Sequence, residues 1–142
     1  MSEKILLVDD EKDFLDVMSE RIEARGMDVT TADSAKKALE SVEKGGYDAI
    51  ILDLMMPGMD GLQALKAIKK KNPDLQVILL TGHATIEKGI EAMKLGAMDF
   101  LEKPADLDKL TDIIKKAQAR KMVIIERKME EKMKQIIGTK GW

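Results

Sequence analysis

Five polar residues stand where short apolar runs of this sequence end, and their types suit a cation and a phosphoryl group. They are Asp9, Asp10, Asp53, Thr81 and Lys103. Three carboxylates form a hard-oxygen set that suits Mg²⁺, which takes one or two carboxylates together with phosphate oxygens. A lysine and a hydroxyl suit the remaining phosphoryl oxygens, and a carboxylate can act as a nucleophile toward phosphorus. The residue types therefore indicate phosphoryl chemistry, provided that the fold brings them together.

The setting of Asp53 is the clearest of the five. This residue follows the apolar run 49–52, AIIL, and precedes the turn-forming segment 57–61, PGMDG. A short apolar run bounded by turn signals predicts a buried strand. Open α/β sheets bind their ligands beyond the carboxyl ends of such strands, so a carboxylate at this position indicates a binding or reaction site.

Strand-like and helix-like segments alternate along the chain, which predicts an α/β fold. The expected strands are 4–8, 28–32, 49–52, 76–81 and 99–103. A helical segment follows each strand; Ser34 offers an N-cap to the second helix, and we expect no two-residue hairpin. Such alternation predicts a doubly wound parallel sheet covered by helices on both faces, for which five strands commonly take the order 2-1-3-4-5.

This strand order would bring the five polar residues to one edge of the sheet. Its switch point lies between the first and third strands, where Asp9, Asp10 and Asp53 would meet. Thr81 and Lys103 end the fourth and fifth strands on the same side. Adjacent acids repel one another unless a cation lies among them, so the sequence predicts a Mg²⁺ site at this edge.

The motifs at these strand ends resemble the receiver domain of two-component response regulators. They are Asp9-Asp10, Asp53 before MMPGMDG, LLTGHA and FLEKP, and the resemblance spans roughly 4–120. The segments TGHATIE and GAMDFLEKP are most similar to receivers that precede AAA+ transcription activators. The resemblance implies a flavodoxin-like receiver fold and a phosphoryl acceptor that is supplied by a histidine kinase or a phosphotransfer protein.

The resemblance also implies a role for each site residue. Asp53 accepts the phosphoryl group, the Thr81 hydroxyl bonds its oxygens and Lys103 pairs with them. The Mg²⁺ ligands implied by the resemblance are side chains and one backbone carbonyl, that of Met55: Asp9, Asp10, Asp53 and Met55. Such a chain catalyses only its own phosphotransfer and slow dephosphorylation, so it is not an enzyme acting on an outside substrate.

Further features implied by the resemblance concern switching. Phe100 moves inward on activation together with Thr81, and this changes the surface of the fourth helix, fifth strand and fifth helix. His83 and Met55 occupy positions that modulate the rate of dephosphorylation. The resemblance also implies a cis peptide bond between Lys103 and Pro104, although cis bonds are uncommon even before proline.

Simpler interpretations of single residues remain open. The acids Asp9, Asp10 and Glu11 could cap the first helix, because acids favour a helix N-terminus. Thr81 could be an ordinary strand-end residue, Lys103 a surface cation and His83 an exposed side chain. Phe100 is at the same time expected to be a half-buried packing residue. We favour a site because the strand ends converge.

Three other functions share this fold or this chemistry. A phosphatase with an aspartyl-phosphate intermediate usually carries a second acid two residues after its nucleophile, where this chain has Met55. A nucleotide or flavin binder needs a Gly-rich or hydroxyl-rich loop after the first strand, where this chain has acids instead. A third alternative is an interaction domain with an inert pocket.

The bulk composition narrows the class of protein. The chain has 142 residues, of which 44% are hydrophobic and 35% are charged, and it contains no Cys. This composition fits one globular domain with a modest core and excludes thiol chemistry. No stretch is apolar enough to span a bilayer and no signal peptide is apparent, so we expect a cytoplasmic protein. Few aromatic residues, 3% of the chain, speak against stacking on nucleic acid.

The last segment exceeds what a receiver needs, so we divide the chain into a receiver, 1–120, and a helical extension, 121–142. An apolar stripe runs along the extension: Met122, Ile125, Met129, Met133 and Ile136. The stripe fits a linker or a dimer seam.

The extension is also basic: from Lys115 onward there are nine Lys and Arg and three Glu. A basic amphipathic helix can also bind a membrane surface or nucleic acid. We favour a homodimer, through the extension or through the face of the fourth helix, fifth strand and fifth helix. We expect no membrane insertion and no direct binding of nucleic acid.

Overall fold

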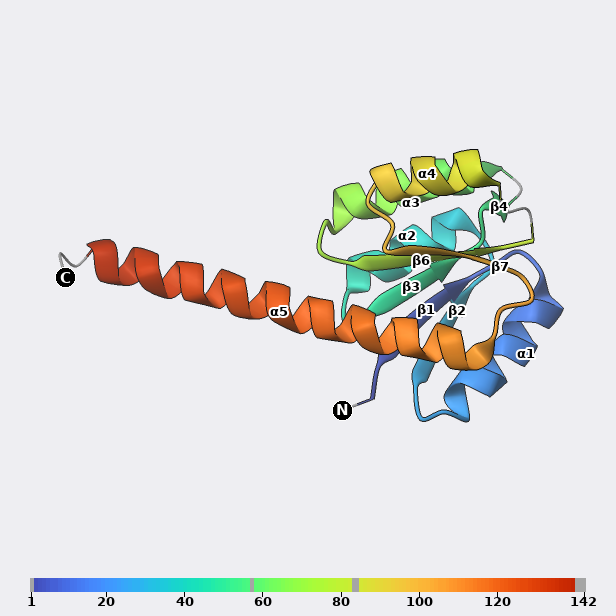
Figure 1. Cartoon of the computed structure of the whole chain (residues 1–142), viewed down its shortest axis with the longest axis horizontal. Helices are drawn as coiled ribbons and strands as arrows, with labels where there is room; N and C mark the ends of the chain where they lie inside the picture. Colours follow the sequence, from blue (N-terminus) through green and yellow to red (C-terminus); the bar gives the residue numbers. More distant parts are fainter. Residues whose placement is uncertain (1, 57, 83–84, 140–142) are drawn as a thin grey trace.

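A five-stranded parallel sheet forms the centre of the computed structural model, which describes residues 2–56, 58–82 and 85–139. The strands of this sheet are β1 (Lys4–Val8), β2 (Asp28–Ala32), β3 (Ala49–Leu52), β6 (Gln76–Thr81) and β7 (Asp99–Glu102). Their spatial order is β2-β1-β3-β6-β7 (Figure 1), so the predicted order 2-1-3-4-5 is confirmed. The last strand ends at Glu102, one residue earlier than expected.

Helices cover both faces of the sheet (Figure 1). One face packs against α1 (Lys12–Glu23) and the first part of α5 (Leu107–Thr139). The other face packs against α2 (Ala35–Lys44), α3 (Gly61–Lys71) and α4 (Ile86–Lys94). Every residue of β3 and every residue of β6 from Val77 to Leu80 is apolar, because successive side chains enter opposite cores and neither face meets water.

Side-chain hydrogen bonds cap the N-termini of α2 and α3. The Ser34 hydroxyl accepts a hydrogen bond from the backbone N–H of Lys37, as predicted for an N-cap. The Asp60 carboxylate accepts one from the backbone N–H of Leu62 and begins α3. These caps satisfy backbone donors that the first turn of a helix cannot pair internally.

A small hairpin follows β3 and contradicts the expectation that no two-residue hairpin occurs. The strands β4 (Met55–Met56) and β5 (Met59–Asp60) are antiparallel, and Met56 pairs with Met59, so only positions 57 and 58 lie between them. Gly58 has a φ of 81°, the kind of backbone conformation that two-residue hairpin loops use. The turn-forming segment 57–61 does not by itself predict this hairpin, because each of the two paired strands has only two residues and is too short to show alternation.

The helix α5 continues past the sheet without a break as far as Thr139, so the predicted helical extension is present and includes Gly138 (Figure 1). The first turns of the extension, which include Lys121 and Lys128, contact the body of the protein. Lys121 Nζ lies 3.3 Å from Asp48 Oδ1, and Lys128 forms an ion pair with Asp74. Among the described residues, no helix combines the length and the apolar character needed to cross a membrane.

Candidate phosphoacceptor site

The two buried carboxylates of the site lie side by side because their strands are neighbours in register. Val8 pairs with Leu52, so the residues that follow them, Asp9 and Asp53, leave the sheet at the same level. The backbone N–H of Asp53 donates to the carbonyl oxygen of Val8 at 3.0 Å. Parallel strand pairing thus joins two residues that are far apart in the sequence.

Three carboxylates form a compact cluster at this edge. One oxygen each from Asp9, Asp10 and Asp53 lies within 4.8 Å of the others. Asp9 and Asp53 are buried, with 1% and 5% of their surface exposed, whereas Asp10 is exposed. An all-oxygen set that is open to solvent on one side fits Mg²⁺, which retains several water ligands. The predicted carboxylate ligands are therefore together; the carbonyl of Met55 stays a predicted ligand.

Lys103 places a positive charge beside the cluster. Its Nζ atom lies 2.6 Å from Asp9 Oδ2, 3.7 Å from Asp53 Oδ2 and 4.0 Å from Glu11 Oε1. The closest ion pair is thus with Asp9, not with the predicted acceptor Asp53. The peptide bond between Lys103 and Pro104 is cis, as the resemblance implied. This lysine offsets part of the repulsion among the carboxylates.

Protonation at the site reflects burial and neighbouring charges. Burial raises the pKa of Asp53, the charge of Asp9 raises it further, and these effects outweigh the hydrogen bonds and the Lys103 charge that lower it. Burial acts to lower the pKa of Lys103. The hydrogen bond to Asp9 and the negative charges around the ammonium reverse this, so the pKa of Lys103 lies above its usual value. The ammonium is therefore charged at neutral pH.

Thr81 and Met55 both donate hydrogen bonds to Asp53. The Met55 backbone N–H lies 3.2 Å from Asp53 Oδ1. The Thr81 side chain is fully buried, and its hydrogen bond to Asp53 lowers the pKa of that carboxyl. The predicted residues Thr81 and Lys103 are thus at the same edge as the carboxylates. His83 lies outside the described residues.

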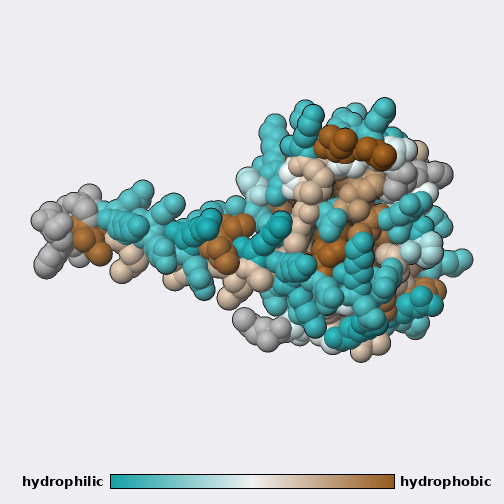
Figure 2. All heavy atoms as spheres, viewed as in Figure 1, coloured by the Kyte–Doolittle hydropathy of each residue, from teal (hydrophilic) through white to brown (hydrophobic). Residues whose placement is uncertain are grey.

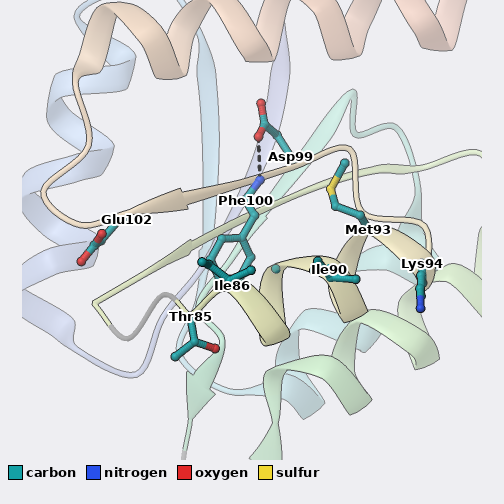
Figure 3. A pocket seen from close by; sticks show the side chains of 9 residues that line it. Thr85, Ile86, Ile90, Met93, Lys94, Asp99, Phe100 and Glu102 are labelled. Atoms are coloured by element: carbon teal, nitrogen blue, oxygen red, sulfur yellow. Dashed lines mark hydrogen bonds between the residues drawn. The ribbon is translucent and has the colours of Figure 1, made fainter.

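Phe100, the other predicted switch residue, lies apart from the carboxylates. It is half-buried and lines an open groove of about 820 Å³ between α4 and β7 (Figure 3). Ile86 and Ile90 of α4 line the same groove and are exposed, at 83% and 53%. Apolar surface gathers over α4 and recurs along the end of α5 (Figure 2). The packing role expected for Phe100 is confirmed.

Two neighbours of the site were not identified from the sequence. The ring of Phe14 lies 4.0 Å from Lys103 Nζ, measured to the ring centroid. Lys88 of α4 lies with its Nζ 3.7 Å from the sulfur of Met55. The one sequence signal for Phe14 is the position of an aromatic residue four residues after Asp10, one turn into the helix that follows the acids.

Comparison with known proteins agrees with this arrangement. Residues 5–115 match the model of the response regulator receiver domain. The transcriptional regulatory protein ZraR of Escherichia coli O157:H7 is 37% identical over 120 residues, which cover 84% of this chain and 27% of ZraR. FixJ of Bradyrhizobium diazoefficiens is 35% identical over 113 residues, which cover 80% of this chain and 55% of FixJ. The chain thus spans less than two thirds of these curated relatives.

Solved structures agree as well. A response regulator receiver domain protein from Clostridium thermocellum has a TM-score of 0.82 and 36% identity, and the match covers 86% of this chain and 98% of that protein. Regulators of the ZraR, NtrX and DctD types are among the relatives, so the predicted likeness to receivers of AAA+ activators is confirmed. On its sequence, its fold and the carboxylate cluster at its strand ends, this chain belongs to the response regulator receiver family.

Proposed function

We propose that Asp53 is the phosphoryl acceptor of this receiver and that Mg²⁺ bound by Asp9, Asp10 and Asp53 supports the transfer. The observation that carries the proposal is the meeting of three carboxylates, a lysine and a hydroxyl at one edge of the sheet. Phosphoryl transfer asks mainly for positioning and for neutralisation of charge, and this set supplies both.

In the proposed reaction, an Asp53 oxygen forms a bond to phosphorus as the bond between phosphorus and the donor nitrogen breaks. The leaving nitrogen takes its proton from solvent. Lys103 and the Thr81 hydroxyl are placed to meet the phosphoryl oxygens, and Mg²⁺ would neutralise their charge. Hydrolysis follows when water attacks phosphorus, which releases inorganic phosphate and restores the carboxylate.

Intact-mass measurement tests this function. The chain is incubated with Mg²⁺ and phosphoramidate, with Asp53→Ala as the control. We expect one added phosphoryl group that needs Mg²⁺ and is lost in Asp53→Ala. An adduct that persists in Asp53→Ala would place the acceptor elsewhere. Absence of both an adduct and phosphate release, under conditions where Mg²⁺ binds, would refute the proposal.

We further propose that a histidine kinase or phosphotransfer protein supplies the phosphoryl group in the cytoplasm and that a second copy of the chain is the partner. Residues 1–120 then form the receiver, and 121–142 form a linker or dimerisation helix. Two apolar surfaces support self-association: the groove of α4 and β7, and the exposed stripe that includes Met129 and Met133.

Light scattering separates these two surfaces, before and after phosphorylation. If the extension pairs, Met129→Glu combined with Met133→Glu yields a monomer, while Lys132→Glu, an exposed change on the same helix, does not. If the α4 groove pairs, Ile90→Glu yields the monomer instead. A monomer for the unmodified chain in both phosphorylation states would exclude the dimer.

A further inference from the structure

The ammonium of Lys103 lies between acids and one aromatic ring. On one side are Asp9, Asp53 and Glu11, at 2.6, 3.7 and 4.0 Å. Against it lies the ring of Phe14, 4.0 Å from centroid to Nζ. The lysine side chain is 17% exposed, so little water remains around it. A cation over an aromatic face is attracted by the negative charge of that face, and most strongly where water is excluded.

We propose that Phe14 is a positioning residue for Lys103, and that its ring holds the ammonium beside Asp53 through a cation–π contact. The inference rests on the proposed acceptor role of Asp53 and assigns to α1 a part in that reaction. Phe14 does not touch the reacting atoms; it acts through the lysine.

The physical need for such a contact lies in the distances. The only carboxylate within hydrogen-bond distance of Lys103 Nζ is that of Asp9, among the described residues. A cation bound by Asp9 competes with the ammonium for that carboxylate, because both are positive. The ring does not take part in this competition. The Phe14 ring therefore keeps the Lys103 ammonium at the strand ends, close to Asp53, when the Asp9 carboxylate binds another cation instead of the lysine.

If Phe14 served only to pack α1 against the core, substitutions at this position would have different effects from those expected for a cation–π contact. The ring is half-buried and packs against the core on the α1 side of the sheet, next to Leu15 and Met18. If only packing mattered, Leu would serve nearly as well as an aromatic ring, and the two would differ in stability alone. If the aromatic face matters, Tyr preserves the function and Leu does not, whatever each does to stability.

The test compares Phe14→Leu with Phe14→Tyr, with Met18→Leu in the same helix as the control for altered packing. NMR of the Lys103 ε-methylene protons in the Mg²⁺-free chain reports the ring directly, because an aromatic face shifts nearby protons upfield. Urea denaturation gives the stability of each variant. The rate constant for phosphorylation by phosphoramidate, measured at saturating Mg²⁺, reports the effect on the reaction.

We expect Phe14→Leu to lose the upfield shift and to slow phosphorylation about fivefold, within the range that a cation–π contact supplies. Phe14→Tyr and Met18→Leu should stay within about twofold of the unmodified chain, also on that scale. Equal losses in Phe14→Leu and Phe14→Tyr, or none in either, would overturn the proposal. If the unmodified chain accepts no phosphoryl group, the acceptor function fails, and the proton shifts alone then decide the contact.

Discussion

Asp9 and Asp53 lie buried side by side, an arrangement that costs stability in the metal-free chain. Among the described residues, Lys103 is the one ammonium that forms ion pairs with these two carboxylates, at 2.6 Å from Asp9 and 3.7 Å from Asp53. Burying carboxylates without full compensation costs free energy. The pKa of Asp53 is raised for the same reason, because burial disfavours the charged form of its carboxyl.

Replacing Asp53 by Asn should therefore stabilise the metal-free chain at neutral pH, by about 1 kcal/mol on the usual scale of single substitutions. The pKa of Asp53 is raised on folding, so the carboxyl favours the folded state below its ordinary pKa, and that contribution is lost as pH rises through the folded pKa. The gain from Asp53→Asn should consequently shrink as pH falls from 7.5 toward 4.

Urea denaturation in EDTA at several pH values measures this gain, with Asp33→Asn, an exposed acid near the same edge, as the control. A gain that is equal at every pH would show that charge burial is not its cause. Mg²⁺ should reverse the order, because it stabilises only the chain that binds it.

At the scale of elements, one close backbone approach fixes the loop that follows Asp53. The helix α3 begins at Gly61, whose backbone N–H donates to the carbonyl oxygen of Leu54 at 2.7 Å. A Cβ atom added at Gly61 would lie 2.3 Å from Leu54 Cα and from its carbonyl oxygen. Leu54 directly follows Asp53, so the start of α3 is packed tightly against the residue next to the proposed acceptor.

We expect Gly61→Ala to lower the free energy of unfolding by about 3 kcal/mol, since backbone atoms cannot yield as a flexible side chain can. The same change at Gly82 is the matched control, because a Cβ there meets nothing within 4 Å and φ is not positive. Urea denaturation compares the two variants. Similar, small effects at both positions would show that the loop relaxes freely. A slower phosphorylation of Gly61→Ala would show that the loop positions the acceptor.

At the scale of the whole molecule, contacts between α5 and the body continue beyond the family match, which ends at residue 115. Asp48 is buried; its Oδ2 accepts from the Lys4 backbone N–H at 2.8 Å and lies 3.4 Å from Gln118 Nε2. Lys121 and Lys128 pair with Asp48 and Asp74. The extension therefore has a proximal part held by the receiver and a distal part that projects away from it (Figure 1).

Hydrogen exchange should divide α5 accordingly. Amides of 118–128 should exchange more slowly than those of 130–137, because a helix without tertiary contacts frays and opens at little cost. Asp48→Asn should speed exchange in 118–124 and leave 130–137 unchanged. Glu43→Gln, which breaks an ion pair between α2 and α3, is the control. Measurement at low protein concentration limits self-association; uniform exchange along 118–137 would contradict the division.

The sequence alone determined the features that depend on local patterns. Four of the five strands have the expected bounds, because apolar runs that end at turn or polar residues are local signals. The strand order followed from the commonest arrangement for five alternating strands, and it placed Asp9, Asp53, Thr81 and Lys103 at one edge. The motifs at those strand ends then indicated the family.

Only the tertiary structure decided which of these groups touch. Lys103 and Asp9 are 94 positions apart, so their 2.6 Å contact depends on how α1, β7 and the start of α5 pack. The same holds for the ring of Phe14 against that lysine and for Lys121 against Asp48. Periodicity states which face of a helix is apolar, but the residue that this face meets is set by packing between elements that are distant in sequence.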